Sequence, residues 1–178
     1  DQVHNLLHRG KRVSQCSLKH VIALLAPGQG SQTPGMLADW LELPGAADHI
    51  ARWSDISGLD LARLGTTATA DEITDTAVTQ PLVVAATLLA NAELVNRGLL
   101  AGKQTVVAGH SVGEIAAYAI AGVISADDAV KLAAVRGAEM AKACAVEPTG
   151  MSAVLGGDEA EVLARLDALD LVPANRNA

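Results

Sequence analysis

Residues 106–114 read VVAGHSVGE, and this stretch decides the fold. A short apolar run ends at Gly109, and the pattern G-x-S-x-G then places Ser111 between two glycines, ahead of a small-residue helix. In a nucleophile elbow the serine projects from a tight strand-to-helix turn, and side chains at Gly109 and Gly113 would collide across that turn. The pattern can arise by chance in a chain with 16 glycines, but the flanking strand and helix favour a nucleophilic Ser111.

The two neighbours of Ser111 have different predicted roles. The helix that follows the turn would direct its amides and its dipole at a developing negative charge, and the Val112 amide is the expected oxyanion donor. His110 is a poor general base for Ser111, because adjacent residues of extended backbone point to opposite sides. We interpret His110 as a packed or hydrogen-bonded histidine that supports the turn.

Two further features leave alternatives open. The loop at residues 27–35, PGQGSQTPG, matches neither G-x-G-x-x-G nor a Walker A motif. It is either a flexible turn or a segment that brings Gln29 close to a ligand, where an amide can donate to an oxyanion. Arg136 leans towards the apolar face of its predicted helix, and burial of this cation is costly unless an anion meets it. The alternative is an i,i+3 pair with Glu139.

Strands and helices alternate along the rest of the chain, which predicts an α/β class with a mainly parallel sheet. Both strands of the first part are expected to be buried, and Pro81 is expected at the first position of its helix. We expect strands at 21–26, 105–108, 151–155 and 171–174, and helices near 45–54, 71–76, 81–97, 114–121, 126–144 and 158–169.

Composition limits the classes of function. Half of the 178 residues are hydrophobic, which suits a compact domain, and the net charge of −7 disfavours a phosphate-backbone binder. The absence of an 18-residue apolar run predicts no membrane span. Cys16 and Cys144 form no CxxC or Cys/His cluster, so we expect a cytoplasmic protein without a disulfide framework or a metal site. Residues 1–20 are expected to be a disordered leader, and the end after residue 174 resembles a cut.

The motifs PGQGSQ, TQP and GHSVGE, together with an arginine 25 positions after Ser111, resemble the malonyl-CoA:acyl carrier protein transacylase family. The resemblance covers residues 21–178. It implies an α/β-hydrolase-like core, here incomplete, at 21–146. It also implies the truncated start of a ferredoxin-like subdomain at 147–178.

The same resemblance implies a role for each candidate residue. Ser111 would carry malonyl as an ester, the Val112 amide and Gln29 would form the oxyanion hole, and Arg136 would pair with the malonate carboxylate. The acyl group would pass from malonyl-CoA to the phosphopantetheine thiol of acyl carrier protein, with no cofactor beyond the coenzyme A thioester, and with neither nucleic acid nor membrane as a partner. The residues implied to line or approach the pocket are Gln80, His110, Met140, Asn175 and Asn177.

One family feature has no counterpart in this sequence. The general base of the family is a histidine well downstream of the serine, in a G-x-F-H-like segment. The chain has no Phe, and its histidines, at positions 4, 8, 20, 49 and 110, all precede Ser111. We therefore expect a fragment whose own activity is impaired. Two other functions remain open: a serine hydrolase or thioesterase with the same elbow, and a non-catalytic fragment that binds a carrier protein.

Overall fold

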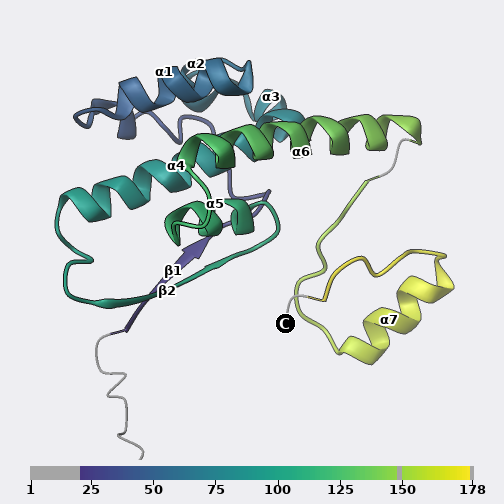
Figure 1. The fold of residues 1–178 in the computed structure, drawn as a ribbon. Coiled ribbons are helices and arrows are strands. Elements are labelled where there is room, and N and C mark those ends of the chain that lie inside the picture. The colour runs from purple at the N-terminus through teal and green to yellow at the C-terminus, as the bar shows by residue number, and fades with distance from the viewer. Residues whose placement is uncertain (1–20, 148–149, 177–178) are drawn as a thin grey trace, which may run out of the picture. The chain divides into compact units, whose positions relative to one another are not determined.

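A computed structural model describes residues 21–147 and 150–176, and the expectation for residues 1–20 lies outside these ranges. The chain divides into two units, the first ending at Val146 and the second beginning at Glu147. Within the described ranges, the first unit contains two strands and the helices labelled α1 to α6, and the second contains the helix α7 (Figure 1).

In the part of the chain that the structure describes, the sheet of the first unit has two parallel strands, β1 (Val21–Ala26) and β2 (Gln104–Gly109). Val21 lies opposite Gln104 and Ala26 opposite Gly109, so the predicted strands and their parallel pairing are confirmed. The prediction that both strands are buried is wrong, because Leu25 is 77% and Val106 is 54% exposed. Within the described ranges, α5 (Gly113–Ile120) is the helix that packs against both strands, and it covers one face.

The predicted helices of the first unit are present at similar positions. They are α1 (Ala46–Ser57), α3 (Ala70–Thr74), α4 (Thr76–Asn96), α5 and α6 (Ala126–Val146). The 3-10 turn η2 (Trp40–Glu42) and the short α2 (Leu61–Thr66) were not predicted from the sequence. Asp60 begins α2 by accepting a hydrogen bond from the Arg63 amide at 3.0 Å, which is a local signal for this helix.

The helix α4 begins five residues before the expected start. Asp75 caps it by accepting from the Ala77 amide at 2.8 Å, so Pro81 lies inside the helix and its predicted first position is wrong. By length and composition alone, α4 is long and apolar enough to cross a membrane, but half of the relevant stretch is buried inside the protein. Its buried side chains pack against α6 and the other helices, as in the core helix of a globular domain.

A single apolar cluster joins these helices. Its largest fully buried members include Leu37, Ile50, Leu61, Ile73, Leu82, Val84 and Val130. At the start of α6, Asp127 accepts from Trp53 Nε1 at 3.2 Å and pairs with Arg52, which lowers the pKa of the Asp127 carboxyl. These bonds fix the start of α6 against α1, and the same helix carries Arg136 two to three turns later.

The second unit contains α7 (Glu159–Ala168), where a helix was predicted, and Asp158 caps it through the Glu161 amide at 3.1 Å. The strands predicted at 151–155 and 171–174 are absent, and Met151, Leu155 and Val172 are exposed. A strand needs a hydrogen-bonded neighbour, and the described part of the chain supplies none for these segments. The ferredoxin-like assignment stays a prediction.

Candidate active site

Ser111 occupies a strained turn between β2 and α5. Its φ of 54° lies in the left-handed region, which a serine rarely adopts. The His110 amide donates to the Ala26 carbonyl at 3.0 Å, and the Glu114 amide donates to the Ser111 carbonyl at 3.0 Å. The end of β1 and the first turn of α5 therefore hold the exposed Ser111 in the conformation of a nucleophile elbow.

The glycines of the elbow allow backbone segments to touch. A Cβ on Gly109 would lie 2.2 Å from the Gly113 carbonyl carbon, and a Cβ on Gly113 would lie 2.3 Å from the Ala26 carbonyl oxygen. Real Cβ atoms do not approach backbone atoms this closely. The close backbone contacts expected from the motif are thus present. The contact at Gly113 also brings α5 close to the end of β1.

Gly113→Ala is expected to lower the free energy of unfolding by about 1–3 kcal/mol, the usual cost of overpacking. Alanine is the better helix former, but the added methyl would meet the carbonyl oxygens of Ala26 and Pro27, which are main-chain atoms that cannot rotate away. Urea unfolding measures the effect. Gly150→Ala is the matched control, because nothing lies within 4 Å of its Cβ position. Equal stability of the two variants would contradict the close packing of the elbow.

Val112 connects the serine to the helix. Its side chain is fully buried, which anchors the turn, and the residue is the N-cap of α5. Among the described residues, the Val112 amide has no hydrogen-bond acceptor. An unused amide next to Ser111 at a helix N-terminus has the donor character that an oxyanion requires.

The loop that carries Gln29 lies against the elbow. A Cβ on the buried Gly28 would be 2.6 Å from His110 Nδ1 and 2.8 Å from the His110 carbonyl oxygen. Gln29 Nε2 donates to Thr76 Oγ1 at 3.0 Å, and Ser31 Oγ donates to the Gly28 carbonyl at 2.8 Å. The loop is therefore tied to both the elbow and the start of α4. His110 lies close to Gly28 in this junction but is exposed, so its interpretation as a supporting residue stays a prediction.

Arg136 reaches the serine from α6. Its Nη2 donates to Ser111 Oγ at 3.2 Å, and its Nη1 donates to Gln80 Oε1 at 2.6 Å. The alternative pairing with Glu139 is not observed, because Glu139 accepts instead from Lys142 at 2.7 Å. The guanidinium has no carboxylate partner within the described ranges.

Two residues from the implied pocket support the arginine. Gln80 is fully buried on α4, and its Nε2 donates to Met140 Sδ at 3.2 Å. The structure thus brings Ser111, Arg136, Gln80 and Met140 into one chain of contacts. Asn175 belongs to the second unit, so its approach to the site stays a prediction, and Asn177 lies outside the described residues. Thr76, which contacts Gln29, was not predicted from the sequence as part of the site, because it matches no catalytic motif.

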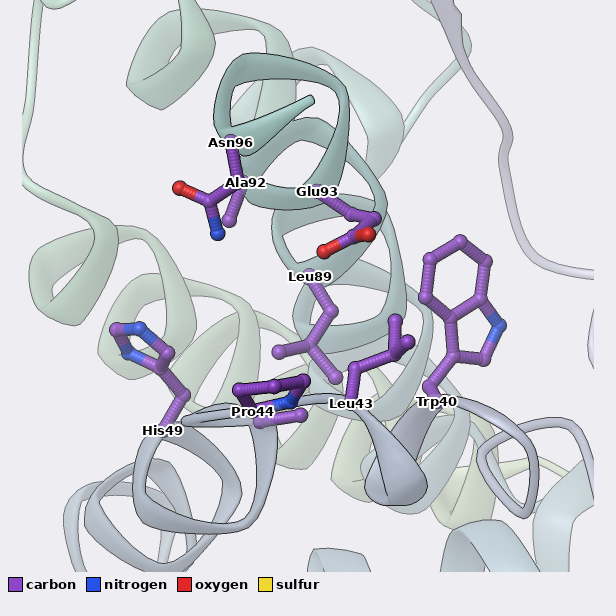
Figure 2. A pocket seen from close by; sticks show the side chains of 9 residues that line it. Trp40, Leu43, Pro44, His49, Leu89, Ala92, Glu93 and Asn96 are labelled. Carbon is purple, nitrogen blue, oxygen red and sulfur yellow. The ribbon is translucent and has the colours of Figure 1, made fainter. Parts of the chain in front are cut away.

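A separate small hollow lies away from Ser111, between the η2–α1 region and the C-terminal half of α4. In Figure 2, Trp40 and His49 lie to either side of Leu89. Its lining residues are Trp40, Leu43, Pro44, Ala46, His49, Leu89, Ala92, Glu93 and Asn96. None of the predicted site residues lines this hollow. The described residues also contain no group of three His, Cys, Asp or Glu side chains that could hold a metal ion.

With this geometry established, the family can be assigned. The family model described as the acyl transferase domain matches residues 24–178. The chain belongs to the acyl transferase domain family. The matched region of this acyl transferase domain includes Ser111 and Arg136, and also Gln29, Gln80 and Val112.

Individual relatives with similar sequences or structures are named as transacylases or complexes of them. A malonyl CoA-acyl carrier protein transacylase of Mycolicibacterium smegmatis is 85% identical over 143 residues, 80% of this chain and 49% of the relative. A crystal structure of MCAT from Mycobacterium tuberculosis aligns with a TM-score of 0.84 and 79% identity, over 89% of this chain and 53% of the other. A type II PKS acyl-carrier protein in complex with its malonyl-transacylase aligns with a TM-score of 0.63 and 35% identity, over 70% and 40%. The chain spans about half the length of the curated relatives it matches.

Proposed function

We propose that the chain is the serine-bearing part of an acyltransferase that moves malonyl from coenzyme A to the phosphopantetheine thiol of acyl carrier protein. The observation that carries this proposal is the 3.2 Å contact between Arg136 Nη2 and Ser111 Oγ. The guanidinium beside Ser111 has no carboxylate partner among the residues that the structure describes. A guanidinium binds a carboxylate through a two-pronged fork, and a malonyl thioester carries a free carboxylate whereas an acetyl thioester does not.

The reaction divides into two transfers at Ser111. In the first, Ser111 Oγ attacks the thioester carbonyl, its proton passes to a general base, and coenzyme A leaves as the thiol while the malonyl ester forms. The negative charge that develops on the carbonyl oxygen would be met by the Val112 amide and by Gln29. In the second, the carrier-protein thiol attacks the ester and Ser111 regains its proton. These steps need only the thioester and two nucleophiles, so the proposal includes no cofactor.

The general base belongs to polypeptide outside this sequence in our proposal. The histidines of the chain all precede Ser111, and His110 packs against Gly28. The chain matches only about half of its curated relatives, which are named malonyl CoA-acyl carrier protein transacylases. One solved relative is a malonyl-transacylase in complex with an acyl-carrier protein, which supports a carrier protein as the acceptor. The proposal includes a cytoplasmic location for this reaction.

The test compares the 178-residue chain with an extended chain that adds the remaining half of the Mycobacterium tuberculosis relative at its C-terminus. Each is mixed with malonyl-CoA, followed by holo acyl carrier protein, and intact mass spectrometry follows the malonyl group. The extended chain is expected to gain one malonyl group on Ser111 and to pass it on, with the 178-residue chain much slower. An extended chain that forms no ester would reject the proposal.

The same experiment separates the two rival functions. A hydrolase would release free malonate without loading the carrier protein, and it would show no preference for malonyl over acetyl thioesters. A non-catalytic fragment would capture the carrier protein without any mass increase on itself, and Ser111→Ala would leave that capture unchanged. If malonyl is released to water and not transferred, a hydrolase replaces the proposed function. If the carrier protein is captured without acylation, a non-catalytic fragment replaces it.

A further inference from the structure

The helices α4 and α6 meet through main-chain atoms directly beside the arginine of the site. A Cβ on the buried Gly137 of α6 would lie 2.7 Å from the Thr76 carbonyl oxygen and 3.2 Å from the Ala77 Cα. Cβ atoms keep more than 3.0 Å from other atoms, so any side chain at this position would force the two helices apart. Gly137 directly follows Arg136 in the chain, so its lack of a side chain sets the separation of the helices where the arginine begins.

The backbone of α6 does not itself require a glycine here. Gly137 lies in the interior of a 21-residue helix and is not among the glycines with a positive φ. Alanine is the better helix former at such a position. What excludes it is the carbonyl oxygen of Thr76, a main-chain atom in a helical turn that the Asp75 side chain caps through the Ala77 amide at 2.8 Å. The glycine therefore serves the close approach of α6 to α4.

A buried side chain bridges the two helices at this crossing. Gln80 lies one turn after Thr76 on α4 and is fully buried. Its Oε1 accepts from Arg136 Nη1 at 2.6 Å, and its Nε2 donates to Met140 Sδ at 3.2 Å. Arg136 and Met140 lie on either side of Gly137 in the chain, so both ends of the Gln80 amide depend on how closely α6 approaches α4.

The same approach determines where the guanidinium lies relative to the nucleophile. While Arg136 Nη1 is held by Gln80, its Nη2 donates to Ser111 Oγ at 3.2 Å. We propose that Gly137 is a positioning residue for substrate selection, which brings Arg136 to the place beside Ser111 where it meets the free carboxylate of the acyl group. This inference rests on the proposed function. Displacement of the guanidinium weakens the contact with a malonyl group but costs an acetyl group nothing, so the defect is one of selectivity.

The kinetic test compares Gly137→Ala with Ala133→Gly in the extended chain. Ala133 is fully buried on α6 one turn earlier, and loss of its methyl weakens the helix without forcing it away from α4. Gly137→Ala is expected to lower kcat/KM for malonyl-CoA by about tenfold, less than the ~10²-fold that a 1 Å misplacement can cost. Transfer from acetyl-CoA stays within a few-fold of the wild type. Ala133→Gly keeps the wild-type ratio of malonyl to acetyl transfer. An unchanged ratio in Gly137→Ala, or an equal loss in Ala133→Gly, would overturn the inference.

A double variant shows whether Gly137 acts through the arginine. In the Arg136→Ala background, Gly137→Ala is expected to have no further effect on malonyl transfer, because the group that it displaces is already absent. A second tenfold loss in that background would mean that the glycine acts on the site in another way, and the inference would fail. If Gly137→Ala does not fold, Gln80→Asn shortens the bridge between the helices without a collision. It is expected to lower malonyl preference in the same way, and unchanged preference there would contradict the inference.

A further measurement does not depend on activity. The Nε–H signal of Arg136 is observed by ¹⁵N NMR in the 178-residue chain, assigned by its loss in Arg136→Lys, with Arg165 on α7 as the internal reference. Gly137→Ala is expected to shift the Arg136 signal and speed its exchange with water, whereas Ala133→Gly preserves it. If the extended wild type transfers no malonyl, the proposed function fails, and this signal still decides whether Gly137 positions Arg136. An unchanged Arg136 signal in Gly137→Ala means that it does not.

Discussion

Ser111→Ala is expected to abolish the malonyl ester and to lower malonyl transfer by about six orders of magnitude, the effect of deleting the nucleophile of a comparable catalytic serine. The reason is that, in the proposed reaction, the Ser111 hydroxyl forms the ester bond. The remaining donors at Val112 and Gln29 can still polarise a bound thioester, which leaves a small residual rate over the reaction in water. The intact mass of the extended chain after exposure to malonyl-CoA reports the ester directly.

The control for this variant is Ser152→Ala, which removes an exposed hydroxyl from the second unit. It is expected to gain the same malonyl mass as the wild type. Peptide mapping of the wild type should place the added mass on the peptide containing Ser111. A malonyl adduct of equal amount on Ser111→Ala would show that another residue is acylated, and the elbow would then lose its proposed role.

The elbow could be predicted from sequence because each of its requirements is local. Gly109 and Gly113 lie within two residues of Ser111, and the collisions that exclude larger residues there involve atoms of the turn and the adjoining end of β1. The parallel pairing of β1 and β2 followed in the same way from two apolar runs separated by helices. Short-range steric constraints are thus sufficient to predict the turn that carries Ser111.

The environment of Arg136 could not be predicted in this way. A helical position alone left an ion pair with Glu139 and a ligand carboxylate equally open, because both lie within reach of a long side chain. In the structure the guanidinium instead contacts Gln80 on another helix, whose amide oxygen accepts from it at 2.6 Å, and the ligand carboxylate stays a prediction. Thr76 was missed for the same reason, since its partners Gln29 and Gly137 are far away in the chain.

The wrong predictions of strands and of a helix start have one cause in common. The apolar runs at 151–155 and 171–174 have strand-like composition, but a strand forms only beside a neighbour that completes its hydrogen bonds. Pro81 was placed at a helix start by its local preference, whereas the Asp75 cap begins α4 earlier and the surrounding helices hold it. Local sequence preference therefore predicts the wrong structure where hydrogen bonding or packing with distant residues determines it.

Arg136→Ala is expected to remove the preference for malonyl over acetyl thioesters. A bidentate, charge-assisted contact contributes about 3 kcal/mol in total, which corresponds to about a hundredfold loss in kcat/KM for malonyl-CoA. Acetyl-CoA has no carboxylate to lose, so its kcat/KM should stay within a few-fold of the wild type. Steady-state transfer to acyl carrier protein by the extended chain, with each thioester in turn, measures the ratio.

Arg136→Lys separates charge from geometry. A lysine keeps the positive charge but loses the planar fork and, with it, the simultaneous contacts with Ser111 Oγ and Gln80 Oε1, so malonyl preference should be recovered only in part. Lys131→Ala, which removes an exposed cation from the same helix, is expected to leave the ratio unchanged. If Arg136→Ala lowered malonyl and acetyl transfer equally, the arginine would act by holding Gln80 and the elbow in place. The 3.2 Å contact would then no longer support a carboxylate-bearing acyl group.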